Sequence, residues 1–467
     1  MNPNPDTSAA PLQASPAAQR VRSVGDQTVS LFLPCAPGAE ALLADELRQL
    51  LGTGAALQID RGGVQVMGDA VVAMRLNLES RLAQRVLWPL AHGPYENELD
   101  LYALARSVPW GDWITTAQTF RIDTTAQRSP LQSLNFATLR VKDAVCDVMR
   151  DLTGERPSID TRFPDLPLTL HLSPSHATLY ADTSGEALFK RGWRDAQGLK
   201  GEAPLKETLA AAMLAAAGWQ GRAQDGPLFD PCCGAGTIVI EAAQIACGIA
   251  PGLQRKFAFE RLLPFRSHQN AWSRLKDAAR ARQHPPAVAI FAGDVSFRMT
   301  DFAQRNAERA GVAEAISFKT ADALQRPPPV AAATAPDATV GVMMINPPYG
   351  ERIAPLGSLG GRQRGGQGEP QAVPAQRHVG QASREGFEGG ASATEFFSQL
   401  ASHWKRHYPG WTAWLLSPDL KLPQALRLKE SRRVPMWNGA IECRLFRFDL
   451  VAGSARAPRS TDPTAPA

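Results

Sequence analysis

The sequence has no hydrophobic run long enough to cross a membrane, and it has little cysteine. Its longest apolar stretch, Leu209 to Gly218, is about half of what a bilayer-spanning helix needs. The N-terminus lacks the apolar core of a secretory signal, and the six cysteines include no Cys-x-x-Cys pair. Neither a disulfide framework nor a zinc-finger spacing is present. We therefore expect a cytoplasmic protein with no membrane segment and no bound metal.

The sequence also lacks a strong excess of charge of one sign. Fifty basic and forty-five acidic side chains leave a formal net charge of +5, which alone does not indicate a polyanionic partner. One local cluster stands out, because residues 253–282 hold eight basic, two acidic and four aromatic side chains. Such a mixture is typical of an RNA-binding surface, and equally of a solvated helix face above core aromatics.

Length and composition divide the 467 residues into two or three domains with flexible ends. Residues 1–28 and 453–467 are rich in Pro, Ala and Ser and are predicted to be disordered tails, and residues 354–391 to be a disordered Gly-rich insertion. Residues 29–84 and 85–185 mix strands and helices in an α+β pattern. Residues 186–452 alternate strands with helices, which predicts an α/β domain with a mostly parallel sheet.

The patterns also place individual elements in each half. In the first half we expect strands at 29–34, 57–59, 64–66, 120–123, 169–172 and 177–182, and helices at 39–51, 69–82 and 137–152. In the second half we expect strands at 228–230, 288–293, 316–319, 340–345 and 411–416, and helices at 236–247, 298–310 and 393–407. A ligand of such a domain binds at the C-terminal ends of its strands.

Three segments at those strand ends carry candidate chemistry. The segment Asp230-Pro-Cys-Cys-Gly-Ala-Gly-Thr237 lies between a strand and a helix, where glycines let a cofactor approach the backbone. It is not a P-loop, and alone it is also compatible with a simple tight turn. Asp294 and Asp322 follow the next two strands, where a carboxylate can accept hydrogen bonds from ribose hydroxyls. A single Asp there is more often a turn residue, but two favour a cofactor site.

The sharpest motif is Asn346-Pro-Pro-Tyr349, which follows the apolar run 342–345. A stiff Pro-Pro turn can hold the Asn346 side-chain oxygen and the Pro347 carbonyl so that both accept hydrogen bonds from one planar amino group. Tyr349 can stack on the ring that bears this group. The motif therefore predicts recognition of a nucleobase or amide nitrogen.

Together these motifs resemble class I S-adenosylmethionine (SAM)-dependent methyltransferases that modify an exocyclic amino nitrogen. Further segments resemble bacterial large-subunit (23S) ribosomal RNA guanine-N2 methyltransferases with a THUMP domain, namely 204–212, 229–237, 249–253, 346–351 and 438–443. The resemblance covers about residues 30–450. It implies a ferredoxin-like unit at 29–84, a THUMP RNA-binding domain at 85–185 and a Rossmann-like SAM-dependent methyltransferase domain at 186–452.

The resemblance also implies roles for individual residues. The cofactor would contact Asp230, Gly234, Gly236, Asp294 (ribose), Asp322 (adenine amine) and Asn346. The target amine would lie against Asn346, Pro347 and Tyr349. Candidate RNA-binding residues are Arg140, Lys142, Lys190, Arg191, Arg194, Arg255 and Lys256. Ser296 departs from the family, which often has a second acidic residue at that position.

The predicted activity is therefore methyl transfer from SAM to the N2 of a guanine in 23S ribosomal RNA, with the base single-stranded or flipped out and stacked on Tyr349. The same chemistry on transfer RNA and an RNA-binding ribosome-assembly factor without turnover are alternatives. Methylation of DNA adenine or of a protein glutamine would leave the first 185 residues unexplained. The sequence does not specify the modified nucleotide, a naked RNA or a particle as substrate, the oligomeric state or the role of the insertion.

Overall fold

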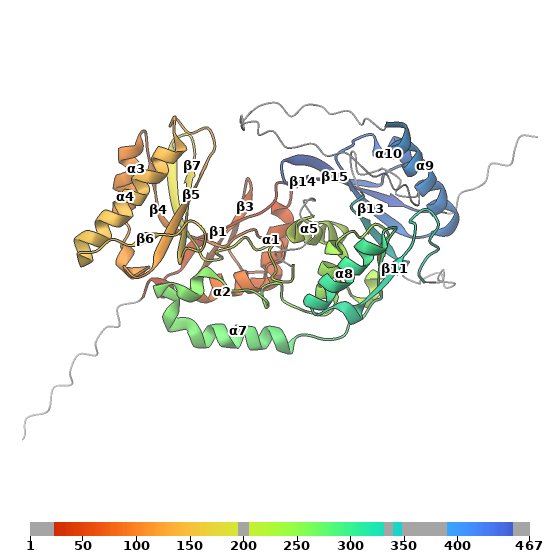
Figure 1. The fold of residues 1–467 in the computed structure, drawn as a ribbon, viewed down its shortest axis with the longest axis horizontal. Coiled ribbons are helices and arrows are strands. Elements are labelled where there is room, and N and C mark those ends of the chain that lie inside the picture. Colours follow the sequence, from red (N-terminus) through yellow and green to blue (C-terminus); the bar gives the residue numbers. More distant parts are fainter. Residues whose placement is uncertain (1–22, 195–204, 331–339, 348–389, 452–467) are drawn as a thin grey trace, which may run out of the picture.

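The computed structural model describes residues 23–194, 205–330, 340–347 and 390–451 (Figure 1). The predicted tails and insertion lie almost entirely outside these ranges, but the tail predicted to end at residue 28 is wrong from Ser23 on. Val24–Asp26 form a 3₁₀ helix, η1, whose Gly25 is buried against Pro264. A Cβ at this position would lie 2.2 Å from the carbonyl oxygen of Pro264, so a larger residue would not fit. None of the described helices has the length and apolarity needed to span a bilayer.

A single eight-stranded sheet runs through the first half of the chain, in the order β2-β3-β1-β4-β8-β7-β5-β6. Its strands are β1 (Val29–Pro34), β2 (Leu57–Asp60), β3 (Gly63–Gly68), β4 (Leu87–Pro94), β5 (Thr119–Ala126), β6 (Ser158–Ile159), β7 (Leu166–Leu172) and β8 (His176–Asp182). Because β1 pairs with β4 at Phe32 and Leu87, the two predicted α+β units share this sheet.

The α-helices described in this half are α1 (Glu40–Leu51), α2 (Ala70–Glu79), α3 (Glu98–Arg106) and α4 (Leu134–Thr153), with η2 (Trp110–Asp112) after α3. Three of these four α-helices, α2, α3 and α4, begin at a side chain that caps them. The Asp69 carboxylate accepts a hydrogen bond from the Val72 amide at the start of α2, and Ser133 caps α4 through the Phe136 amide. In β7 and β8 buried side chains alternate with more exposed ones, so one face of the sheet packs inward and the other meets solvent.

The second half forms a seven-stranded sheet in the order β11-β10-β9-β12-β13-β15-β14. Its strands are β9 (Leu228–Asp230), β10 (Ile290–Asp294), β11 (Ile316–Thr320), β12 (Val342–Ile345), β13 (Thr412–Ser417), β14 (Arg432–Asn438) and β15 (Ile441–Asp449). The first five strands are parallel, and β15 runs antiparallel to both β13 and β14. The predicted fold class, an α+β region followed by a Rossmann-like α/β domain, is confirmed.

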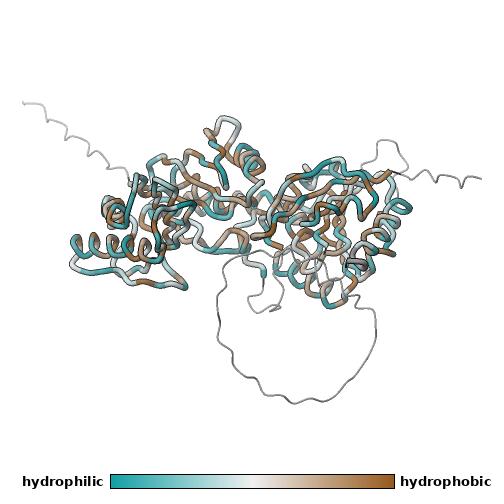
Figure 2. The backbone as a smooth tube through the Cα atoms, turned by 90° about the horizontal axis from the view of Figure 1, so that it is seen from above, coloured by the Kyte–Doolittle hydropathy of each residue, from teal (hydrophilic) through white to brown (hydrophobic). Residues whose placement is uncertain are grey.

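The remaining helices are α5 (Glu207–Ala217), η3 (Ala223–Asp225), α6 (Thr237–Ala246), η4 (Ala258–Arg261), η5 (Leu263–His268), α7 (Gln269–Ala281), α8 (Phe297–Arg309), η6 (Ala313–Ala315), α9 (Gly390–His407) and α10 (Leu422–Leu426). Most of them lie around this second sheet, whereas α7 lies beside α2 under the first half (Figure 1). A continuous core of buried apolar side chains joins the two halves. Figure 2 shows these apolar segments gathered inside both halves, with polar segments around the outside.

A buried group of charges also links the halves. The fully buried carboxylate of Glu241, on α6, receives Arg81 Nη1 at 3.1 Å and Arg191 Nε at 3.0 Å. Arg191 also donates to the Arg81 carbonyl, and the Arg81 guanidinium donates to the Ile249 carbonyl. Because each buried charge has a partner, the junction between α2 and α6 is satisfied electrostatically and defined in geometry.

Candidate active site

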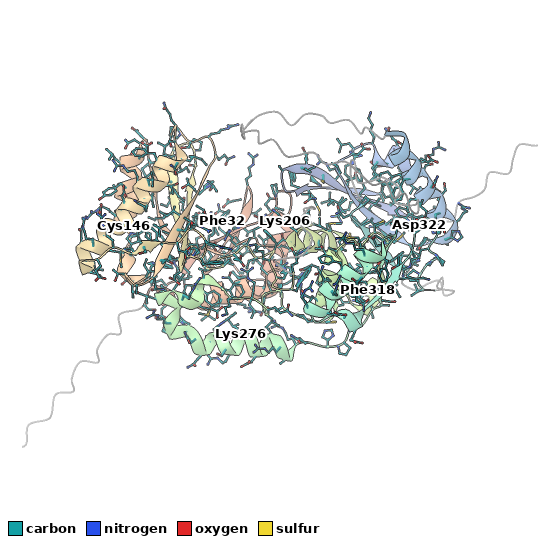
Figure 3. All side chains as sticks on the ribbon, in the orientation of Figure 1. Phe32, Cys146, Lys206, Lys276, Phe318 and Asp322 are labelled. Carbon is teal, nitrogen blue, oxygen red and sulfur yellow. The ribbon has the colours of Figure 1, made fainter. Side chains whose placement is uncertain are left out.

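The strand order reverses beside β9, whose neighbours are β10 on one side and β12 on the other. Such a reversal opens a crevice outside the carboxyl ends of parallel strands, and ligands of open α/β sheets bind there. Four of the motifs found in the sequence follow the strands at this edge: Asp230 ends β9, Asp294 ends β10, Asp322 follows β11 and Asn346 follows β12. Figure 3 labels Asp322 in this half of the molecule.

The two glycines of the turn after β9 have different surroundings. Gly234 and Gly236 both have positive φ, of 51° and 83°. A Cβ on Gly236 would lie 3.0 Å from the Cβ of Ala303, so this glycine lets α8 pack on the turn. A Cβ on Gly234 would meet no atom within 4 Å, so the backbone there borders open space. Only at Gly234 does the turn leave room for a ligand to approach the main chain.

Asp294 ties the turn to the second strand. Its carboxylate accepts hydrogen bonds from the Gly234 amide at 3.0 Å and from the Ser296 amide at 2.9 Å. The Asp294 carbonyl accepts the Ala321 amide at 2.9 Å, which links it to the loop after β11. In that loop Asp322 accepts the Leu324 amide at 2.9 Å. Both carboxylates are half-buried, and a carboxylate accepts hydrogen bonds from hydroxyl or amine donors.

The three carboxylates gather around Cys232. Burial raises the pKa of this thiol well above its usual value, and Asp230, Asp294 and Asp322 raise it further. The thiol therefore stays protonated and is unsuited to nucleophilic attack. Burial likewise raises the pKa of Asp230, and Asp294 adds to the shift, while the Cys232 amide donates to Asp230 at 3.0 Å. A cationic group placed between these acids would relieve their mutual repulsion.

The Asn-Pro segment closes the site on the β12 side. Pairing of Val342 with Leu228 and of Met343 with Phe229 brings the end of β12 beside Asp230. Asn346 is half-buried and Pro347 is buried, directly after the strand. Tyr349, the third predicted member of this group, lies outside the described residues.

Two exposed apolar side chains follow Asp294 closely in the chain. The sequence reasoning did not consider them. Val295 is 67% exposed and Phe297 is 75% exposed, on either side of Ser296 at the start of α8. Other large apolar side chains of this protein are equally exposed, such as Phe163 at 67%, and these two differ in lying next to Asp294. Their only sequence signal was their position next to Asp294.

Two buried polar residues also hold the site in shape without having been predicted. Asn306 of α8 donates to the Ala235 carbonyl in the glycine turn at 2.9 Å. Arg326 lies over the Phe229 ring at 4.6 Å and donates to the Ala292 carbonyl at 2.8 Å, and its own carbonyl accepts the Tyr408 hydroxyl. They brace the strand ends that carry the acids, and nothing in the sequence distinguishes them from surface residues.

Three of the predicted RNA-binding arginines are engaged inside the protein. Arg191 has a side-chain exposure of 2% and pairs with Glu241, so its prediction as an RNA contact is wrong. Arg194 pairs with Glu207 and donates to the Thr237 hydroxyl at 2.7 Å. Arg255 donates to the Ala187 and Glu186 carbonyls, and burial lowers the pKa of its guanidinium to about 10. These side chains are held by the connector and by the glycine turn.

The other predicted RNA contacts lie nearer the surface. Lys190 is exposed and pairs with Glu186 at 2.7 Å, and Lys142 pairs with Asp143 at 2.8 Å. The Arg140 guanidinium lies 5.3 Å from the centre of the Phe136 ring, and Lys256 is exposed. The aromatic residues interleaved with the basic run are buried against one another, which leaves them unable to stack on bases: Phe257, Phe259, Phe265 and Trp272.

Three family models match successive parts of the chain. Residues 30–87 match the RlmL ferredoxin-like domain, residues 95–182 the THUMP domain and residues 191–360 the RMKL-like methyltransferase domain. The matched ranges follow the two halves of the first sheet and then the β9–β12 part of the second sheet. No group of three or more His, Cys, Asp or Glu residues in the described ranges is arranged to hold a metal ion.

The chain is also similar to whole proteins. It is 35% identical over 438 residues to the Ribosomal RNA large subunit methyltransferase K/L of Syntrophotalea carbinolica, covering 91% of this chain but 54% of that protein. A methyltransferase solved in complex with SAH matches with a TM-score of 0.73 at 24% identity, over 91% of this chain and 98% of the other. A possible methylase from Clostridium difficile 630 matches with a TM-score of 0.72 at 25% identity, with the same coverage. The chain thus spans about half the length of the curated relative.

Proposed function

We propose that this chain transfers a methyl group from SAM to the N2 of a guanine in 23S ribosomal RNA, because successive parts of it match the RlmL ferredoxin-like, THUMP and RMKL-like methyltransferase models. The observation that carries the proposal is the gathering of Asp230, Asp294 and Asp322 at the switch point beside Asn346 and Pro347.

The described residues suit SAM in shape and in chemistry. The open space above Gly234 admits a ligand to the backbone, and the buried acid Asp230 would bind the ammonium of the methionine end. Asp294 would accept hydrogen bonds from the ribose hydroxyls, and Asp322 from the adenine amine. The exposed side chains Val295 and Phe297 would be covered by the flat purine ring, which explains their exposure.

When bound, SAM supplies an electrophilic methyl group on a sulfonium, so the protein has to contribute position and hydrogen bonds. The Asn346 side-chain oxygen and the Pro347 carbonyl would accept both hydrogens of the guanine amino group. These bonds would favour a pyramidal nitrogen with an available lone pair and would stabilise the positive charge that develops on it. Transfer would release SAH, and the surplus amino proton would pass to water. Neither Cys232 nor Cys233 takes part, since burial raises the pKa of both thiols.

The proposed substrate is RNA because a THUMP domain precedes the catalytic domain and because the curated relative is named a ribosomal RNA methyltransferase. A guanine inside a duplex cannot reach the edge of the sheet, so the target base is unpaired or flipped out, with Tyr349 proposed to stack on it. A ribosomal RNA substrate places the enzyme in the cytoplasm. The ribosome-assembly alternative without turnover is disfavoured by the complete set of Asp230, Gly236, Asp294, Asp322 and Asn346.

The test is to incubate the protein with labelled SAM and, separately, unmodified 23S ribosomal RNA, transfer RNA and duplex DNA, and to identify the methylated nucleoside after digestion. Label as N2-methylguanosine only in 23S RNA supports the proposal. Label in transfer RNA keeps the chemistry and overturns the substrate. SAM binding without label in any RNA or in ribosomal particles would favour the assembly alternative. The Asn346→Ala variant serves as the control for contaminating activity.

A further inference from the structure

The solvent-facing side of the eight-stranded sheet carries rings and hydroxyls together with the charge pair of Arg121 and Asp123. We name as the open face the side chains that share this side: Phe32, His92, Thr125, Thr169, His171, His176, Thr178 and Tyr180. All are half-buried or exposed, whereas their neighbours along the strands, such as Leu31, Leu170 and Leu179, are buried on the helix side.

The strand register aligns these side chains in two rows across the sheet. One row follows from the pairing of Thr125 with His171, His171 with Thr178, and Thr178 with His92. Hydrogen bonds connect neighbours in this row. His171 Nδ1 lies 3.1 Å from the Thr125 hydroxyl, and His92 Nδ1 lies 2.8 Å from the Thr178 hydroxyl. The neighbouring row begins with Thr169 paired with Tyr180.

The rings of this face lie close to one another in pairs. The Phe32 ring lies over Gly63, where a Cβ would come within 2.7 Å of it, and its centre is 6.2 Å from that of Tyr180. The His92 and His176 rings are stacked at 5.2 Å. Three of the eight histidines of the chain and two of its aromatic side chains thus lie on one face. Aromatic rings laid across a sheet beside hydroxyl donors are what unpaired nucleobases stack on and hydrogen-bond to.

Charge distinguishes this face from the rest of the same domain. Residues 85–185 contain nine basic and twelve acidic side chains, so the domain as a whole repels a polyanion. Five of the acids lie on the two helices: Glu98, Asp100, Asp143, Asp147 and Asp151. On the open face of this domain the exposed acid is Asp123, and it pairs with Arg121 at 2.7 Å. Outside this domain, the Asp60 carboxylate of β2 also lies near the face, since burial and then Asp60 raise the pKa of Tyr180. The open face thus carries fewer acids than the two helices.

The position of the face fits a strand that leads toward the catalytic domain. In Figure 1, α3 and α4 lie at the end of the molecule farthest from β11 and β13, and the sheet lies between them and the second half. Figure 3 shows Phe32 between Cys146 of α4 and Lys206 at the start of α5. Phe32 is thus on the part of the sheet nearest the methyltransferase domain in this view.

We propose that the open face of the eight-stranded sheet is a platform that binds unpaired nucleotides of the substrate RNA by stacking on Phe32 and Tyr180. This inference rests on the proposed function, because it assigns a contact surface to the RNA of that function. A second protein covering the same face is the alternative occupant that the test must exclude.

The test uses the full chain with the double change Phe32→Leu and Tyr180→Leu, which keeps apolar volume and removes the rings. Affinity for a single-stranded 23S RNA fragment should fall by about tenfold or more, as expected for loss of base stacking. The salt dependence of binding should not change, because no phosphate contact is lost. The KM for RNA should rise while kcat and the affinity for SAH stay near wild type. The matched control is Phe163→Leu, an aromatic of the same domain that is 67% exposed in a loop.

Crosslinking of wild-type protein to RNA containing 4-thiouridine provides a second measurement that needs no variant. Adducts on peptides of β1 and β8 support the platform, and adducts confined to α3, α4 or the catalytic domain overturn it. Unchanged RNA affinity in the double variant, with wild-type methylation intact, overturns the platform and leaves the proposed function standing. Absence of RNA methylation by the wild-type protein instead overturns the proposed function. Protection of the open face by a copurifying protein, with RNA binding unaffected, also overturns the platform.

Discussion

The two sheets of this protein place their polar side chains differently. In the second sheet β9, β12 and β13 are buried along almost their whole length, and polar residues appear where the strands end. In the first sheet β7 and β8 alternate, and polar residues appear along one face. A sheet covered on both sides can present chemistry only at its edge, where a few groups converge on one small ligand. A sheet covered on one side presents a broad surface, which suits an extended partner.

Asn346→Ala should have the largest effect on activity, and it tests whether the strand edge carries the chemistry. Loss of an acceptor at the strand edge should lower kcat by about a thousandfold, in the range seen when a group that stabilises developing charge is removed. Affinity for SAH and for RNA should stay within about twofold of wild type. Single-turnover methylation together with calorimetric binding of SAH measures both. Wild-type turnover in this variant would remove Asn346 from the chemistry.

Arg191→Met tests how much the buried charge pair between the two halves contributes to the stability of the protein. It leaves the buried carboxylate of Glu241 with one partner fewer, so unfolding should become easier by about 3 kcal/mol. The neighbouring change Lys190→Met, at an exposed side chain, should cost less than about 0.5 kcal/mol. Urea unfolding of both variants gives the comparison. Equal stability of the two would mean that the junction does not depend on the buried charge.

Asp294→Asn should act mainly on the cofactor. The Asn side chain keeps one oxygen, so one of the two amide bonds from Gly234 and Ser296, which end on different carboxylate oxygens, is lost together with the charge that strengthens hydrogen bonds from ribose hydroxyls. Affinity for SAH should fall by about 2 kcal/mol, with RNA affinity unaffected. Glu308→Gln, an exposed acid at the far end of α8, is the matched control. A parallel loss of RNA binding would contradict the separation between edge and face.

Asp230→Asn should have the smallest effect on stability, and in the opposite direction. Burial and Asp294 raise the pKa of Asp230 in the folded protein, so the folded state holds a proton that the unfolded state has released. Wild-type stability therefore falls as the pH rises from about 4 toward the folded-state pKa. The asparagine variant should lose this decline and gain about 1 kcal/mol at neutral pH, while binding SAH more weakly. Thermal melts across pH 4 to 8 measure it, and an unchanged pH profile would contradict the assignment.

Strands with a continuous apolar run and a polar stop were predictable. The patterns placed β9 to β13 within about two residues, because Asp230, Asp294 and Asn346 mark where burial ends. The same reasoning missed β4, which contains Pro89, Gly93 and Pro94, and it missed the β14–β15 hairpin, whose arginines alternate with core residues. In both cases the pairing with other strands, and not the local sequence, stabilises the strand.

The same limit applies to the candidate site. The convergence of Asp230, Asp294 and Asp322 was predictable because parallel strands end on one edge. The burial of Arg191 was not predictable. A basic residue in a connector gives the same sequence pattern whether it faces water or pairs with a distant acid such as Glu241, fifty positions later. Arg326 and Asn306 were missed because their partners are backbone carbonyls, which leave no trace in a sequence.

The charge pairs at Glu241 limit where the domains of this protein can be separated. Arg81 comes from the ferredoxin-like unit, Arg191 from the connector and Glu241 from the catalytic domain, so a cut at residue 186 would strand a buried carboxylate with half of its partners. A catalytic domain grafted onto another RNA-binding module would need a neutral residue such as Gln at position 241, or would have to bring α2 with it. The ferredoxin-like unit and the methyltransferase domain therefore have to be exchanged together.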